Sequence, residues 1–179
     1  MPDPAIARPA ASVIVLCRRR GALRLLMGWR GAGHRFMPNR LVFPGGGVDP
    51  GDFAAMPASP LAAPTRAALL AETGGGADAA LAAALGMAAA RELAEETGLT
   101  LGSPPALAGL RYLMRLITPA ALPIRFDARF FLLDRACLAG SLAGSGELEG
   151  LDWLTPEEAL AQDLAIPTRR VVERVQALP

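Results

Sequence analysis

Apolar residues gather in short stretches along the chain, and polar or glycine-rich turns separate them. Residues 11–18 and 23–29 are rich in valine and leucine and flank the turn Arg19, Arg20 and Gly21, which predicts a β-hairpin. Shorter apolar stretches predict strands over 41–43, 110–118, 124–133 and 150–154. The first half of the chain is therefore expected to start with strands, and the glycines at 45–47 interrupt it after the predicted strand over 41–43.

Alanine-rich and helix-capping sequences predict the helices. Asp78 is suited to cap a long helix that runs to Thr97, and Gly98 is suited to end it. Thr155 followed by Pro156 predicts a second helix start, and a last helix is expected over 167–177. The order of elements predicts one mixed α/β domain of layered architecture over residues 1–179.

Composition narrows the classes of function. The chain has 179 residues and a formal charge of +1, so no strong field favours nucleic acid. No apolar run approaches the ~20 residues of a membrane span, and residues 1–8 lack the pattern of a signal peptide, so we expect a cytoplasmic protein without membrane contact. All 18 basic residues are arginine, and His34 is the only histidine, so carboxylates and arginines must carry any chemistry.

Three carboxylates crowd the end of the long helix. At ~100° per residue, Glu92, Glu95 and Glu96 share about one third of the helix circumference. Like charges at this spacing repel by ~0.2–0.5 kcal/mol per pair. The helix dipole disfavours anions in the last turn by ~0.3–1 kcal/mol each. A solvated polar face would explain the cluster taken alone, whereas a hard cation such as Mg²⁺ or Mn²⁺ would remove the repulsion.

A glycine-rich loop precedes this helix. Phe43 and Pro44 lead into Gly45, Gly46 and Gly47, directly after a predicted strand. Glycines let the backbone approach a ligand closely and expose amides and carbonyls to phosphate or metal. A flexible hairpin is the alternative for the loop by itself, but loop and carboxylate helix in this order favour a binding site.

Together the loop and the helix resemble the Nudix hydrolase family, whose signature is G-x5-E-x7-R-E-U-x-E-E-x-G-U, with U aliphatic. The second half is complete from Arg91 to Leu99, and the first half is Gly46 followed by Asp52 in place of glutamate. The resemblance implies an α/β/α sandwich with a mixed sheet and a loop–helix–loop catalytic motif. It also implies hydrolysis of a diphosphate bond in a nucleoside diphosphate linked to a moiety X.

The resemblance also implies roles for individual residues. Glu95 and Glu96 would be the principal ligands of Mg²⁺ or Mn²⁺, together with the carbonyl of Gly45. Glu92 would be a ligand or the general base, and Arg91 would orient a glutamate. Gly46 and Gly47 would approach the substrate. The auxiliary carboxylates would be Asp52, Glu147 and Glu149, although solvated loop charges also explain the last two. Arg30, Arg35, Arg125 and Arg129 are candidates for substrate phosphates, with plain surface arginines as the alternative, and His34 could contact a nucleotide.

The spacing inside the signature departs from the family. Between Asp52 and Arg91 lie 38 residues where the pattern has seven, so about 31 are inserted, at about 53–84. Nudix proteins that cleave coenzyme A have a similarly enlarged box, which makes coenzyme A or an acyl-CoA a candidate substrate. The insertion has few large apolar residues, so its deletion is expected to change substrate preference more than stability. A homodimer is also compatible with the resemblance, and a catalytically silent nucleotide-binding or regulatory module is the alternative function.

Overall fold

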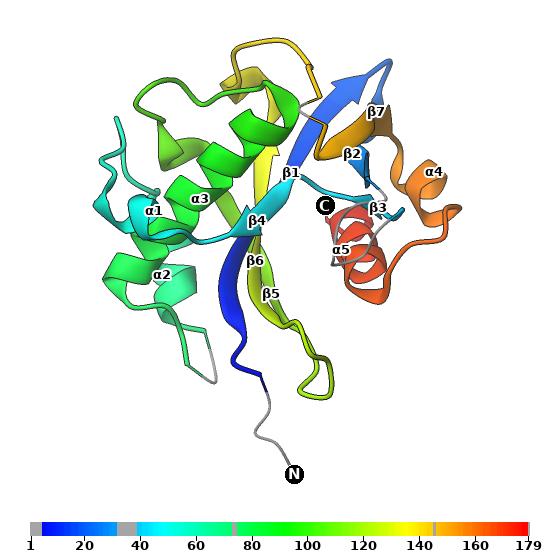
Figure 1. Ribbon diagram of the computed structural model, residues 1–179. Helices are drawn as coiled ribbons and strands as arrows, with labels where there is room; N and C mark the ends of the chain where they lie inside the picture. Colours follow the sequence, from blue (N-terminus) through cyan, green and yellow to red (C-terminus); the bar gives the residue numbers. More distant parts are fainter. Residues whose placement is uncertain (1–4, 32–38, 73–74, 145, 179) are drawn as a thin grey trace.

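The computed structural model describes residues 5–31, 39–72, 75–144 and 146–178 and has three layers. A seven-stranded sheet lies between α1–α3 on one side and α4–α5 on the other (Figure 1). This is the predicted α/β/α sandwich with a mixed sheet. Among the described residues, no helix is long and apolar enough to cross a membrane.

The sheet is built around its first strand. The strands are β1 (Arg8–Arg19), β2 (Ala22–Arg30), β3 (Leu41–Val42), β4 (Gly45–Gly47), β5 (Arg111–Ile117), β6 (Phe126–Asp134) and β7 (Leu148–Leu154). Their order is β3-β2-β1-β6-β5, with β4 on β1 and β7 on β2. Only the β1–β6 pair is parallel among the described strands. The predicted hairpin is confirmed as β1–β2.

The helices begin and end close to the predicted signals. They are α1 (Pro50–Ala54), α2 (Ala63–Leu70), α3 (Ala79–Thr97), α4 (Pro156–Leu160) and α5 (Ile166–Gln176), with short 3-10 turns at Leu107–Gly109 and Arg135–Cys137. Asp78 accepts a hydrogen bond from the Leu81 amide, and Gly98 ends α3 in the left-handed region at φ +71°. Helix α1, at the start of the insertion, was not predicted from the sequence.

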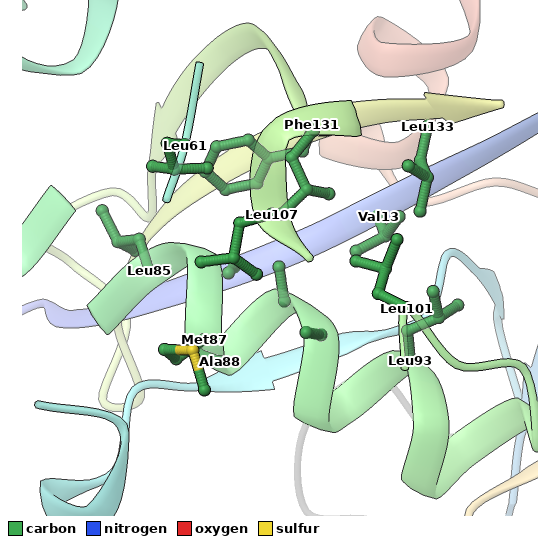
Figure 2. Close-up of a cluster of buried hydrophobic side chains, with 14 of the residues drawn as sticks. Val13, Leu61, Leu85, Met87, Ala88, Leu93, Leu101, Leu107, Phe131 and Leu133 are labelled. Atoms are coloured by element: carbon green, nitrogen blue, oxygen red, sulfur yellow. The ribbon is translucent and has the colours of Figure 1, made fainter. Parts of the chain in front are cut away.

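Alternate residues of the strands supply two cores. Val13, Leu26 and Phe131 face α3, whereas Ile14, Leu25 and Phe130 face α5. Figure 2 shows side chains from β1, β6 and α3 gathered in the first core. Packing α3 on this face fixes the position of its acidic end relative to the glycine loop.

The inserted segment also belongs to the first core. Leu61 and Leu69 are buried there, and the Thr65 hydroxyl donates to the Leu110 carbonyl at 2.8 Å (Figure 2 includes Leu61). Burying a leucine side chain stabilises a fold by roughly 1.5–3 kcal/mol. The segment thus has no core of its own because it completes the main one, so its deletion is expected to lower stability as well as to change substrate preference. Residues 79–84, which the expected insertion includes, form the first turns of α3.

Candidate active site

The acidic end of α3 lies against the glycine turn of β4. The Gly45 amide donates to Glu96 Oε2 at 2.8 Å in a buried hydrogen bond. A Cβ added to Gly46 would lie only 2.4 Å from Glu92 Oε1, and one added to Gly45 would collide with the Ala11 carbonyl. Glycine is therefore required at position 45, where strand β1 occupies the space of a side chain, and a side chain at position 46 would displace the Glu92 carboxylate.

Arg91 binds the carboxylates together. Its Nε and Nη2 donate to the two oxygens of Asp52 at 3.1 and 3.0 Å. Nη1 donates to Glu92 at 2.8 Å and to Glu95 at 3.1 Å. Nη2 also donates to the Gly47 carbonyl at 2.9 Å. All five N–H groups of the guanidinium thus have acceptors, which fixes its plane and orients two glutamates of the helix.

Arg91 and the groups that it binds (Asp52, Glu92, Glu95 and the Gly47 carbonyl) form a clamp, to which α1 contributes Asp52. Its side chain is buried, and Oδ2 also accepts from the Asp49 amide at 2.8 Å at the start of the helix. The sequence suggested Asp52 as an auxiliary carboxylate near a metal. In the structure its two oxygens are instead taken by Arg91 and the helix start. The sequence did not identify the Gly47 carbonyl as a member of the clamp, because a main-chain acceptor leaves no signal in residue identity.

Negative charge exceeds positive charge in the cluster. Burial raises the pKa of Glu96 to about 7, against the Gly45 hydrogen bond and the charge of Arg30, and the charges of Glu92 and Glu147 raise it further. Burial likewise raises the pKa of Glu92, with contributions from Glu95 and Glu147, although Arg91 acts in the opposite direction. Glu92, Glu95 and Glu96 are therefore held close together, with fewer positive than negative side chains around them.

The donor chemistry of the cluster fits a hard divalent cation. Glu92, Glu95, Glu96 and the Gly45 carbonyl are all oxygen donors, and Gly46 leaves room for the Glu92 carboxylate. No group of three or more acidic, histidine or cysteine side chains is arranged to hold an ion in the part of the chain that the structure describes. The reason is visible in the contacts: Arg91 holds Glu92 and Glu95, and the Gly45 amide holds Glu96.

Two candidates from outside the helix reach the cluster. Arg30 lies near enough to Glu96 to affect its pKa, and its buried Nε has no hydrogen-bond partner within the described residues. The charge of Glu147 raises the pKa of both Glu92 and Glu96. The Glu147 carbonyl accepts a hydrogen bond from the Gly31 amide at 3.4 Å. Glu149 lines a hollow beside β7 instead.

Two predicted substrate arginines have structural partners, and their role at substrate phosphates stays a prediction. Arg129 is fully buried and pairs with Glu72 at 2.8 Å and with Asp127 at 2.7 Å. Arg125 precedes β6 and donates to the carbonyls of Thr118 and Ala5. The strand spacing gave them one face, but it could not show that acids and carbonyls already occupy that face. His34 and Arg35 lie outside the described residues.

Comparison with known proteins agrees with this geometry. No family model matches the chain. It is 27% identical over 201 residues to the Caenorhabditis elegans protein named "Putative nudix hydrolase 7", an alignment that covers 93% of this chain. The chain spans 59% of the length of that relative.

Solved structures share the fold. A NUDIX hydrolase from Alicyclobacillus acidocaldarius matches with a TM-score of 0.72 and 24% identity, over 94% of this chain and 90% of that one. The NUDIX domain of Shewanella oneidensis NrtR, complexed with ADP ribose, matches with a TM-score of 0.56 and 14% identity, over 96% and 88% of the two chains. The chain has the fold of these Nudix structures, and its sequence is similar to that of the Caenorhabditis elegans protein.

Proposed function

We propose that the protein hydrolyses a diphosphate bond in a nucleoside diphosphate linked to a moiety X, with Mg²⁺ or Mn²⁺ as cofactor. The observation that carries the proposal is the excess of carboxylates at the glycine turn, where Arg91 pairs with Asp49, Asp52, Glu92 and Glu95, and Glu96 accepts from the Gly45 amide. An unbalanced buried cluster costs stability, so its presence favours a role in binding cations. The similarity to nudix hydrolases supports the same activity.

Each residue then has a task. Glu95, Glu96 and the Gly45 carbonyl would hold the divalent cation, which would neutralise charge on phosphoryl oxygens. Arg91 orients Glu92 and Glu95 through hydrogen bonds of 2.8 and 3.1 Å. Arg30 binds a substrate phosphate, since its Nε has no hydrogen-bond partner among the described residues and the guanidinium lies near the acidic cluster.

Proton transfer from water requires a base at the same place. Burial raises the pKa of Glu92, which makes its carboxylate a stronger base than an exposed glutamate. Glu147 faces the cluster from the loop before β7 and supplies a second carboxylate. We assign proton abstraction to Glu92, with Glu147 as the auxiliary acidic residue.

Candidate substrates follow from the enlarged box and from the relatives. Coenzyme A and its esters are suggested by the inserted segment, and ADP ribose by the ligand of the Shewanella domain. Both contain an adenosine diphosphate linked to an X moiety. We place the reaction in the cytoplasm.

The experiment is product analysis by mass spectrometry after incubation with coenzyme A or ADP-ribose and Mn²⁺. Cleavage of the diphosphate, with oxygen from labelled water in one phosphate product, is expected for the wild type. Glu95→Gln and Glu96→Gln are expected to lower the rate by at least ~10²-fold with the fold intact. Full activity in both variants would contradict the site assignment. Ligand binding without cleavage by the wild type would instead identify a silent nucleotide-binding module.

A further inference from the structure

Two five-residue helices, α1 and α4, begin in the same way on opposite sides of the sheet (Figure 1). Each has a proline as its first residue and an acid as its third, Asp52 in α1 and Glu158 in α4. The carboxylate of each acid accepts a hydrogen bond at 2.8 Å from the amide of the residue before the helix, Asp49 or Thr155. An acid at this position stabilises a helix start, and in both helices it also binds an arginine.

The two arginines are held differently. Arg24 reaches Glu158 through one contact of 3.4 Å, and the Glu158 side chain is 51% exposed. Arg91 donates to both oxygens of Asp52, at 3.1 and 3.0 Å, and the Asp52 side chain is 5% exposed. An exposed pair contributes little, whereas a bidentate pair with a buried carboxylate fixes orientation. Of the two helices, α1 therefore holds its arginine in one plane.

Holding Arg91 in one plane determines where its third nitrogen lies. The guanidinium is rigid, so once Nε and Nη2 are bound to Asp52, Nη1 has a fixed position. From that position Nη1 donates to Glu92 at 2.8 Å and to Glu95 at 3.1 Å. Asp52 therefore acts on the two glutamates through Arg91.

The inserted segment supplies the turn that places Asp52. The Ala55 amide donates to the Gly51 carbonyl at 3.0 Å, and this hydrogen bond closes the turn of α1 that contains Asp52. Ala55 lies inside the insertion, whereas Gly51 and Asp52 lie within the family signature. Aspartate is one methylene shorter than the glutamate of that signature, so its reach to Arg91 depends more strongly on the backbone of α1.

We propose that α1 is a positioning element of the hydrolase, in which Asp52 fixes Arg91 and Arg91 in turn orients the catalytic glutamates. The inserted segment then takes part in catalysis, because its first residues close the turn that carries Asp52. The inference rests on the proposed function and adds to it how the enlarged box acts on Glu92 and Glu95. Asp52 is a positioning residue, since its effect reaches the reaction through Arg91.

Exchanging the carboxylate of Asp52 for an amide tests the positioning role. Both oxygens of Asp52 accept from N–H groups, so the amide nitrogen of Asp52→Asn faces a donor in either orientation. We expect kcat to fall at least about tenfold, with KM changed less than about threefold, on whichever of coenzyme A and ADP-ribose the wild type cleaves. Glu158→Gln is the matched control, because it makes the same exchange at the same position of α4, and it should keep the kcat of the wild type. Equal kcat values of the two variants would overturn the proposal.

A double-mutant cycle tests whether Asp52 acts through Arg91. In the Arg91→Met background, Asp52→Asn should cause no further loss of kcat, because the group that Asp52 positions is gone. The effect of Asp52→Asn on the melting temperature should change sign. It lowers the melting temperature of the wild type, but raises that of Arg91→Met, where it removes a buried carboxylate that has lost its partner. Losses of kcat that multiply in the double variant, or a melting temperature that falls in both backgrounds, would overturn the proposal.

Proline substitutions test the contribution of the insertion. Ala55→Pro removes the N–H that donates to Gly51, and Ala161→Pro removes the N–H that donates to the Glu157 carbonyl at 3.0 Å in α4. Both alanines are exposed and directly follow a five-residue helix, so the two variants are matched. We expect Ala55→Pro to lower kcat at least about fivefold and Ala161→Pro to leave it unchanged. Equal kcat values would overturn the role of the insertion.

The outcomes separate the positioning role from the proposed function. If the wild type cleaves neither substrate, the proposed function fails, and this inference fails with it. If the wild type cleaves a substrate and Asp52→Asn has the same kcat as Glu158→Gln, the positioning role fails while the hydrolase assignment stands. All rates are compared well below the melting temperature of each variant, so that unfolded protein does not contribute to a difference.

Discussion

Two networks of acids and arginines involve the inserted segment or the residue before it, and they differ in charge balance. In the first, Arg91 meets Asp52, which precedes the segment, and Glu92 and Glu95, with Glu96 alongside. The second includes Glu72 of the segment and pairs two acids with two arginines: Glu72, Asp127, Arg115 and Arg129. The first has a surplus of negative charge, and the second is neutral.

The directions of the pKa shifts follow the charge balance of each network. Although burial acts against it, hydrogen bonds from Arg115 and the charge of Arg129 lower the pKa of Asp127. Burial and neighbouring acids raise the pKa of Glu92 and Glu96. A neutral network fastens the insertion to β5 and β6, whereas an acidic one is ready to accept a cation. Balance of charge, rather than the number of charged residues, distinguishes the structural network from the functional one.

The largest effect is expected from breaking the neutral network. Arg129→Met leaves Glu72 and Asp127 buried with one arginine fewer, which costs roughly 3–5 kcal/mol. Chemical denaturation measures the loss, and Arg66→Met, at an exposed arginine of α2, is the control. If Arg129→Met is as stable as Arg66→Met, the network does not fasten the insertion.

Divalent cations should stabilise the protein against unfolding by binding to the acidic network alone. At a hundredfold excess over Kd, Mn²⁺ is expected to stabilise the wild type by about 2.7 kcal/mol, and Glu96→Gln should lose most of this. Thermal unfolding at increasing Mn²⁺ measures it, with Glu173→Gln on the exposed face of α5 as control. Equal stabilisation of Glu96→Gln and Glu173→Gln would place the cation elsewhere.

The metal-free protein should lose stability as pH rises towards neutrality. Because the pKa of Glu96 is raised to about 7 in the folded state, folding favours its protonated form, and stability falls between the unfolded pKa near 4.5 and pH 7. From pH 6 to pH 8 we expect a loss of about 1 kcal/mol, measured by denaturation in chelator. The slope should disappear in Glu96→Gln and persist in Glu173→Gln.

The acidic network could be predicted from the sequence, and the neutral one could not. Glu92, Glu95 and Glu96 follow helical spacing, and Asp78 and Gly98 mark the ends of their helix, so local rules were sufficient. The layered α/β architecture followed from the order of elements, and the three-layer sandwich from the resemblance to the Nudix family. The contacts of the acidic network join residues of one helix, or join the glycine loop to the helix that follows it in the family pattern.

Long-range pairing explains what the sequence could not show. Arg129 was expected at substrate, yet its partner Glu72 is 57 residues away in the inserted segment. Leu61 and Leu69 look too few to build a core, but they join one formed by β1, β6 and α3. Sequence spacing shows which residues share an element, whereas tertiary packing decides which of them are already paired.

The smallest effect is expected from the neutral network in acid, and its sign is opposite to that of Glu96. Because the pKa of Asp127 is lowered in the folded state, its contribution is present above the unfolded value near 3.8 and is lost as pH falls through the folded value. Stability of the wild type should therefore decrease below about pH 4, and the slope should flatten in Asp127→Asn. Denaturation between pH 5 and pH 2.5 measures both, with Asp163→Asn at an exposed aspartate as control. An Asp127→Asn slope equal to that of the control would mean that the arginines do not bind Asp127 more strongly than water does, and the contrast between the two networks would then rest on the glutamates alone.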